Sequence, residues 1–176
     1  YCADCKSRKR GFCQGRGAFL YNMQMKQSLL RYKYYGSREY GQYYAEEISR
    51  YVGTQIKRWN PDILVPVPMT CRKKRIRGFN QAEDLAEKIG ELLQIPVAAG
   101  LAVKKRETKS QKKLNAAERM RNLKDAFQIT ESVRGLRILI VDDVYTTGST
   151  IETLAECLKE SGAREIYFVT LCIGQL

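Results

Sequence analysis

The sequence contains no histidine. This absence excludes Ser-His-Asp and Cys-His catalytic arrangements, histidine-ligated metals and acid–base catalysis by imidazole. Any reaction must therefore rely on carboxylates, cations, hydroxyl groups or a bound metal ion.

Long apolar runs are also absent. No stretch of about 18 consecutive apolar residues is present, and no signal-peptide pattern opens the chain. We therefore expect a soluble, cytoplasmic protein without membrane insertion. The 176 residues suit one domain with a proper core and a small appendage. Because the chain begins at Tyr1, we expect its natural N-terminus to lie upstream or to have been trimmed.

Six cysteines are present, and three of them fall near the N-terminus. Cys2 and Cys5 form a Cys-x-x-Cys pair, followed by Cys13, and such a pair can place two thiolates on one Zn²⁺ ion. A tetrahedral site needs four ligands. Two interpretations remain open: half of a structural zinc ribbon, or a flexible tail with reactive thiols. We assign residues 1–18 to a partial Cys-rich zinc-ribbon segment and residues 19–176 to the main domain.

The most informative stretch is residues 138–150, which reads as a strand, a polar loop and the start of a helix. Four aliphatic residues, 138–141, are typical of a strand buried on both faces in a parallel sheet. Asp142 and Asp143 follow directly, and apolar residues then recur at helical spacing over 151–158.

This order of residues indicates a ligand that combines a phosphate with a diol. A loop that enters a helix N-terminus offers backbone N–H groups and a favourable dipole to an anion. The loop consists of Thr146, Thr147, Gly148, Ser149 and Thr150. Asp142 and Asp143 would repel phosphate and instead suit sugar hydroxyls or Mg²⁺. The alternative is a structural strand end followed by an ordinary helix cap.

A second unit of strand, loop and helix occurs earlier in the chain. Residues 63–68 form a short apolar strand that ends in prolines, and residues 82–93 have the pattern of an amphipathic helix. The intervening loop carries five cations, which are Arg72, Lys73, Lys74, Arg75 and Arg77. They suit a polyphosphate, or they are simply solvated.

Strands alternate with helices along the rest of the chain. We expect helices at about 24–34 and 38–59, strands at 101–103, 135–142 and 165–172, and a long polar segment over 104–124. This alternation predicts an α/β fold with a doubly wound, mainly parallel sheet that binds ligands at the carboxyl ends of its strands. The many tyrosines before residue 60 serve packing or, alternatively, stack on bases.

The stretch 138–150 closely resembles the phosphoribosyl pyrophosphate (PRPP) signature of type I phosphoribosyltransferases. The resemblance implies that Asp142 and Asp143 hold the ribose hydroxyls, while residues 146–150 wrap the 5-phosphate. The segment Val67-Pro68-Met69-Thr70 looks like the pyrophosphate loop of that family, and Arg72 and Lys73 extend it.

The resemblance also concerns the polar segment 104–124, which lies where the family has a flexible loop that closes over PRPP. It implies that Arg106 and Gln111 act from this loop in catalysis, together with Asp142 and Asp143. Closure would exclude water from a reactive ribosyl cation. The implied cofactor is Mg²⁺.

Several motifs together resemble the ComF family, the competence-associated proteins of bacterial DNA uptake. They are the N-terminal Cys-x-x-Cys, Pro-Val-Pro, Arg-Gly-Phe-Asn-Gln at 77–81, Gln111 with Arg119-x-x-Asn122, and Val-Asp-Asp-Val-Tyr-Thr-Thr-Gly. The resemblance implies a role in natural competence, with single-stranded DNA and a competence helicase as partners. The zinc ribbon of that family has two Cys-x-x-Cys pairs, whereas one is present here.

The net charge of +12 concentrates in two segments. Residues 72–77 carry five cations, and residues 104–124 carry nine cations and two acids. This positive potential favours a polyphosphate or a single strand of nucleic acid. Two functions are therefore expected: a Mg²⁺-dependent phosphoribosyltransferase, or a non-catalytic module that binds single-stranded DNA or a partner on the same scaffold.

Overall fold

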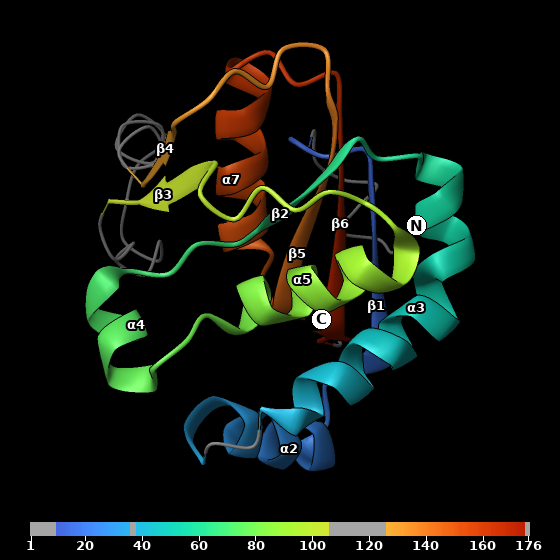
Figure 1. Cartoon of the computed structure of the whole chain (residues 1–176), viewed down its shortest axis with the longest axis vertical. Helices are drawn as coiled ribbons and strands as arrows, with labels where there is room; N and C mark the ends of the chain where they lie inside the picture. The colour runs from blue at the N-terminus through green and yellow to red at the C-terminus, as the bar shows by residue number, and fades with distance from the viewer. Residues whose placement is uncertain (1–9, 36–37, 106–125, 175–176) are drawn as a thin grey trace.

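The computed structural model describes residues 10–35, 38–105 and 126–174. Its centre is a four-stranded, fully parallel sheet (Figure 1). The strands, in their spatial order, are β1 (Gln14–Leu20), β6 (Glu165–Ile173), β5 (Arg137–Tyr145) and β2 (Ile63–Pro66). The predicted doubly wound α/β fold is confirmed.

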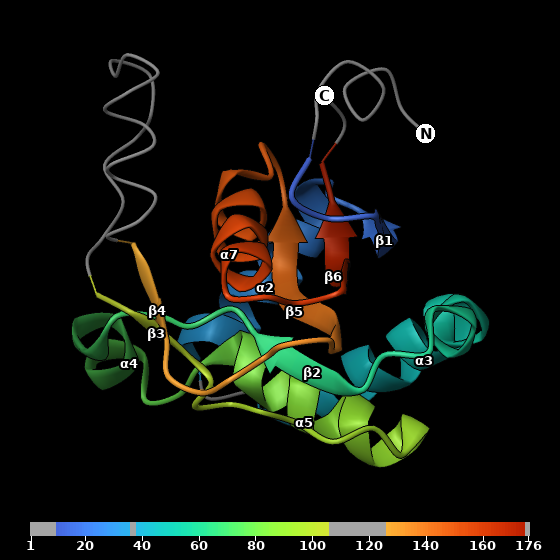
Figure 2. The same ribbon diagram turned by 90° about the horizontal axis from the view of Figure 1, so that it is seen from above.

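Helices cover both faces of this sheet (Figure 2). The helices α3 (Glu39–Trp59) and α5 (Gln81–Leu93) pack on one face, and α7 (Ser149–Glu160) packs on the other. Strand β5 shows why its aliphatic run is continuous: Ile138 and Ile140 belong to the core on the α7 side, whereas Leu139 and Val141 belong to the core on the α3 and α5 side. Each side chain of the run is thus buried on one face or the other.

Smaller elements complete the structure around this frame. An antiparallel pair, β3 (Ala102–Lys104) and β4 (Phe127–Ile129), packs with the α7 side of the core. The helix α2 (Met23–Tyr34) lies beyond the carboxyl ends of β5 and β6, and α4 (Cys71–Arg77) follows β2 (Figure 1). The carboxyl edge of the sheet is therefore flanked by α2, α4 and the start of α5.

The prediction that the basic segment after β2 is a loop is wrong in part, because residues 71–77 form the helix α4. Thr70 caps the start of this helix, since its side-chain oxygen accepts a hydrogen bond from the Lys73 N–H. Gly78 ends it in the left-handed region at φ 84°. None of its residues is buried, so the helix has no apolar stripe from which it could be predicted.

Strands β1 and β4 were not expected from the sequence. Two glycines weaken the strand signal of β1, yet Gly15 is required there because a Cβ atom would lie 1.9 Å from the Phe168 ring. The sheet begins with β1 at Gln14, so the boundary predicted between the Cys-rich segment and the main domain, at residues 18 and 19, falls inside this strand. Strand β5 also continues to Tyr145, past the end predicted at Asp142.

The described part of the chain contains no helix that is long and apolar enough to span a membrane.

Candidate functional site

The acid pair lies near the end of strand β5, at the carboxyl edge of the sheet. The backbone N–H of Asp143 donates a hydrogen bond of 2.8 Å to Oδ1 of Asp142. The ammonium group of Lys33, from α2, forms an ion pair with Oδ2 of Asp143. Burial, and then the charge of Asp143, raises the pKa of the Asp142 carboxyl well above its ordinary value. A divalent cation or the hydroxyls of a sugar would stabilise the ionised pair.

The hydroxyl loop surrounds a small cavity of about 50 Å³ at the start of α7. Gly148 has φ 74°, and a Cβ atom there would lie 2.3 Å from the Tyr145 hydroxyl, so the loop needs glycine at this position. The hydroxyls of Thr147 and Ser149 lie 3.2 Å apart. Hydroxyl donors and a helix N-terminus around a cavity of this size suit a single phosphate. The cavity is lined by Asp142, Val144, Tyr145, Thr146, Thr147, Gly148, Ser149, Thr150 and Ile151.

A larger cleft of about 210 Å³ adjoins this cavity, because Asp142 and Thr150 line both of them. It brings together the predicted pyrophosphate loop and the acid pair, which are 73 residues apart between Thr70 and Asp143. Its lining residues are Val67, Pro68, Met69, Thr70, Lys73, Arg77, Asn80, Gln81, Ala82, Lys104, Asp142, Asp143 and Thr150.

Other predicted residues do not line this cleft. Arg72, Lys74 and Arg75 are exposed on α4, and Lys74 forms an ion pair of 3.0 Å with Glu83. The catalytic candidates Arg106 and Gln111 and the zinc candidates Cys2 and Cys5 lie outside the described residues. Among the residues that are described, no group of three or more His, Cys, Asp or Glu side chains could hold a metal ion. A Mg²⁺ ion at the acid pair would therefore also need oxygens of the ligand.

Sequence reasoning missed some of the residues at the site. Asn80 connects the two walls of the cleft, since its side chain donates to the Val67 carbonyl at 3.1 Å and accepts from the Ala82 N–H at 3.2 Å. The position of Asn80 and Gln81 directly before the amphipathic helix was the available signal. Lys33 gave no such signal, because only the packing of α2 brings it to Asp143.

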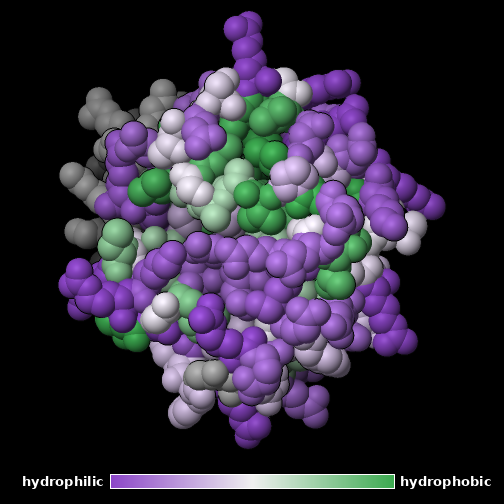
Figure 3. Space-filling model, in the orientation of Figure 1, coloured by the Kyte–Doolittle hydropathy of each residue, from purple (hydrophilic) through white to green (hydrophobic). Residues whose placement is uncertain are grey.

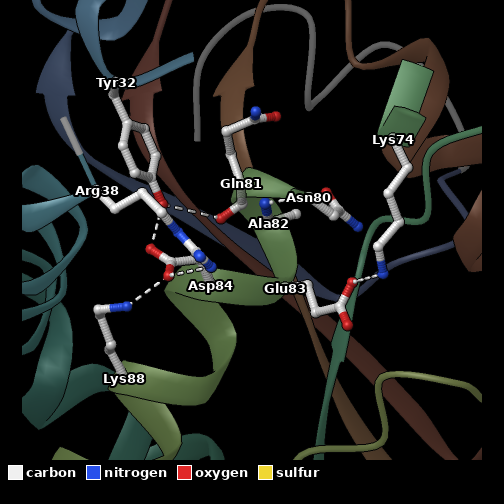
Figure 4. A network of polar contacts seen from close by, with 9 residues as sticks. All are labelled: Tyr32, Arg38, Lys74, Asn80, Gln81, Ala82, Glu83, Asp84 and Lys88. Carbon is white, nitrogen blue, oxygen red and sulfur yellow. Dashed lines mark hydrogen bonds and ion pairs between the residues drawn. The ribbon is translucent and has the colours of Figure 1, made fainter. Parts of the chain in front are cut away.

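A buried polar network holds α2 in this position (Figure 4). The Tyr32 hydroxyl donates to Asp84 Oδ2 at 2.6 Å, and Lys88 contacts the other oxygen at 2.5 Å. Burial, followed by the hydrogen bond to Asp84, raises the pKa of Tyr32. Because Tyr32 precedes Lys33, this network fixes the part of α2 that reaches the acid pair.

Comparison with known proteins identifies the family. The phosphoribosyl transferase domain family matches residues 40–175. Competence protein ComFC of Bacillus subtilis (strain 168) is 34% identical over 172 residues, which cover 92% of this chain and 67% of ComFC. The chain belongs to the ComF family and contains a phosphoribosyl transferase domain.

Other ComF relatives match a shorter part. Competence protein F of Haemophilus influenzae is 35% identical over 109 residues, which cover 60% of this chain and 48% of that protein. DNA utilization protein YhgH of Escherichia coli (strain K12) is 38% identical over 112 residues, with 64% and 49% covered. The matched part thus spans about half the length of these two relatives. The recognition of a ComF-type phosphoribosyltransferase fold from the sequence is confirmed.

Proposed function

We propose that this ComF-family chain binds PRPP at the carboxyl edge of its sheet, together with Mg²⁺. The 5-phosphate would occupy the cavity at the start of α7, the ribose hydroxyls would lie against Asp142 and Asp143, and the diphosphate would extend into the larger cleft. The observation that carries this proposal is that the two cavities adjoin and share Asp142 and Thr150. One ligand with a phosphate, a diol and a diphosphate in that order would occupy both.

We further propose phosphoribosyl transfer as the reaction of this site. The bond between ribose C1 and the diphosphate oxygen breaks, the diphosphate leaves with the bonding electrons, and a nucleophile forms the new bond to C1. Lys73, Arg77 and Lys104 line the cleft and would neutralise the departing diphosphate. Mg²⁺ would supply further neutralising charge. No imidazole is needed, which agrees with a chain that has no histidine.

The proposal extends to residues outside the described ranges. Arg106 and Gln111 would act from the segment 104–124, and Cys2 and Cys5 would contribute to a structural Zn²⁺ site. The relatives named competence protein and DNA utilization protein support a role in DNA uptake during natural competence. We also propose that the chain acts in the cytoplasm, beside a competence helicase.

The outward face of α4 favours a second function, the binding of single-stranded DNA. Arg72 and Arg75 are exposed and do not line the cleft, so a PRPP molecule in the cleft leaves them available. Exposed cations along a short helix suit the phosphates of a flexible strand. Binding of single-stranded DNA is compatible with PRPP binding. If the protein bound DNA and not PRPP, the phosphoribosyltransferase fold would serve only as a scaffold for DNA binding.

Isothermal titration calorimetry with PRPP, with and without Mg²⁺, tests the proposal. We expect micromolar, Mg²⁺-dependent binding, and weaker binding of ribose 5-phosphate and of inorganic pyrophosphate alone, because each fills part of the site. If only a single-stranded oligonucleotide bound, and in a strongly salt-dependent manner, the PRPP site would be refuted.

A further inference from the structure

Gln81 lies in the wall of the larger cleft, at the first position of α5. Its side chain is almost completely buried, with 2% of the residue exposed. Its Oε1 accepts a hydrogen bond of 2.6 Å from Nη1 of Arg77. Because a guanidinium group can only donate, this contact fixes which end of the Gln81 amide is the oxygen. The other end, Nε2, must therefore serve as a donor.

Nε2 of Gln81 is buried and has no hydrogen-bond partner within the described structure. A buried N–H group without an acceptor destabilises the protein that contains it, so native structures rarely keep one without a reason. A ligand oxygen in the cleft would supply the missing acceptor.

The surroundings of Gln81 indicate that this oxygen carries negative charge. Lys73, Arg77 and Lys104 line the same cleft, whose two acids are Asp142 and Asp143, and Asp143 is paired with Lys33. The N-terminus of α5 adds its dipole. Two acids of the first turn of α5 do not cancel this potential, because Lys74 pairs with Glu83 at 3.0 Å and Lys88 pairs with Asp84 at 2.5 Å (Figure 4).

Gln81 is also held in place before any ligand arrives. The Tyr32 hydroxyl lies 3.4 Å from the Gln81 carbonyl, which it contacts as a donor, and the Gln81 side chain extends away from Asp84 (Figure 4). Arg77 is fixed in turn, because its Nη2 donates to the Tyr34 hydroxyl at 2.8 Å and its guanidinium lies over that ring at 4.9 Å. These contacts fix the backbone and the Oε1 atom of Gln81 before a ligand binds, which lowers the cost of ordering the amide.

We propose that Gln81 donates a hydrogen bond from Nε2 to an anionic oxygen of the diphosphate group of PRPP. This inference rests on the proposed function. Gln81 then acts as a specificity residue, because it distinguishes a sugar that carries a diphosphate at C1 from ribose 5-phosphate, which has no group in this part of the cleft. The same chemistry would suit a phosphate of nucleic acid, and titration with a single-stranded oligonucleotide separates the two sources.

Two variants test the proposal by calorimetry with PRPP, inorganic pyrophosphate, ribose 5-phosphate and a single-stranded oligonucleotide. Gln81→Met keeps the length of the side chain and removes the donor, so PRPP and pyrophosphate should bind about tenfold more weakly. Gln81→Glu can still pair with Arg77 but presents a negative charge, so the loss should be larger. Ribose 5-phosphate should bind both variants with unchanged affinity, which also shows that they are folded. Gln42→Met, an exposed position on α3, is the matched control.

Three outcomes would overturn the inference. One is unchanged PRPP affinity in both Gln81 variants. Another is an equal loss for ribose 5-phosphate, which would make Gln81 a structural residue of the whole pocket. The third is a loss confined to a single-stranded oligonucleotide, which would assign Gln81 to nucleic acid. Failure of the proposed function is distinguishable, since the unsubstituted protein would then bind neither PRPP nor ribose 5-phosphate.

Discussion

Lys33 on α2 forms an ion pair with Asp143 at the end of β5, and the two side chains are only 20% and 15% exposed. The cation of α2 thus neutralises one acid of the pair that the proposed ligand must contact. A partly buried carboxylate without a counter-charge is costly, so this pair also helps to hold α2 against the carboxyl edge of the sheet.

Figure 3 shows the mainly hydrophilic surface over the lower part of the molecule, where α2 and α5 lie.

Replacing Lys33 by Met should make PRPP binding more dependent on Mg²⁺. Without the ammonium group, the divalent ion is the remaining positive charge at the acid pair, and the ratio of PRPP affinities with and without Mg²⁺ should rise about tenfold, or about 1.4 kcal/mol. Calorimetry at two Mg²⁺ concentrations measures this ratio. Lys26→Met, at an exposed position of the same helix, should leave it unchanged. An unchanged ratio for Lys33→Met would show that Lys33 does not contribute to PRPP binding at the acid pair.

Gly148→Ala should damage both the fold and phosphate binding. Alanine in the left-handed region costs about 1–2 kcal/mol, and here its Cβ would also meet the buried Tyr145 ring. Gly135→Ala is the matched control, since Gly135 has φ 78° but no atom within 4 Å of an added Cβ. Urea denaturation should show a loss of about 1–2 kcal/mol for Gly135→Ala and a larger one for Gly148→Ala. Only the second variant should lose affinity for ribose 5-phosphate, and equal losses would contradict the proposed role of the loop.

The exposed cations of α4 predict a change in the salt dependence of DNA binding. Removing Arg72 and Arg75 together should make the slope of log affinity against log salt less steep by about 1.4, since each lost phosphate contact contributes about 0.7 for a single strand. Fluorescence anisotropy with a labelled oligonucleotide measures the slope. Replacing the exposed Lys57 and Arg58 of α3 by alanine removes the same charge and should leave it unaltered. A slope that also stays the same without Arg72 and Arg75 would exclude α4 as the contact.

The different exposure of the cysteines predicts which of them a thiol reagent modifies. Burial, together with the nearby Asp143 charge, raises the pKa of the Cys172 thiol to about 12, so the thiol stays protonated at pH 8, and its burial also keeps the reagent away. Cys13 and Cys71 are exposed. Iodoacetamide at pH 8 should therefore modify both of them and spare Cys172, as mass spectrometry of peptides would show. Because Cys71 neighbours Thr70 in the cleft wall, PRPP should slow the labelling of Cys71 and leave that of Cys13 unchanged.

The strand run at 138–141, the acid pair and the hydroxyl loop were predictable because their signals are local. A buried strand needs continuous aliphatic residues, and a loop before a helix needs glycine and hydroxyl side chains. Strand β1 was not predictable in this way, because Gly15 is favoured by the close approach of Phe168, which comes from the other end of the chain. Lys33 and Gln81 depend likewise on contacts between distant elements.

Titration of PRPP into an Asp142→Asn, Asp143→Asn variant tests the proposed site most directly. The amides keep the shape of the acid pair but lose its charge, so PRPP affinity should fall at least about tenfold in the presence of Mg²⁺. Inorganic pyrophosphate should bind at least as well as before, because two negative charges near the cleft are removed. Asp62→Asn, an exposed carboxylate, should bind PRPP normally. Unchanged PRPP affinity in a folded double variant would contradict the assignment of the acid pair to the ribose.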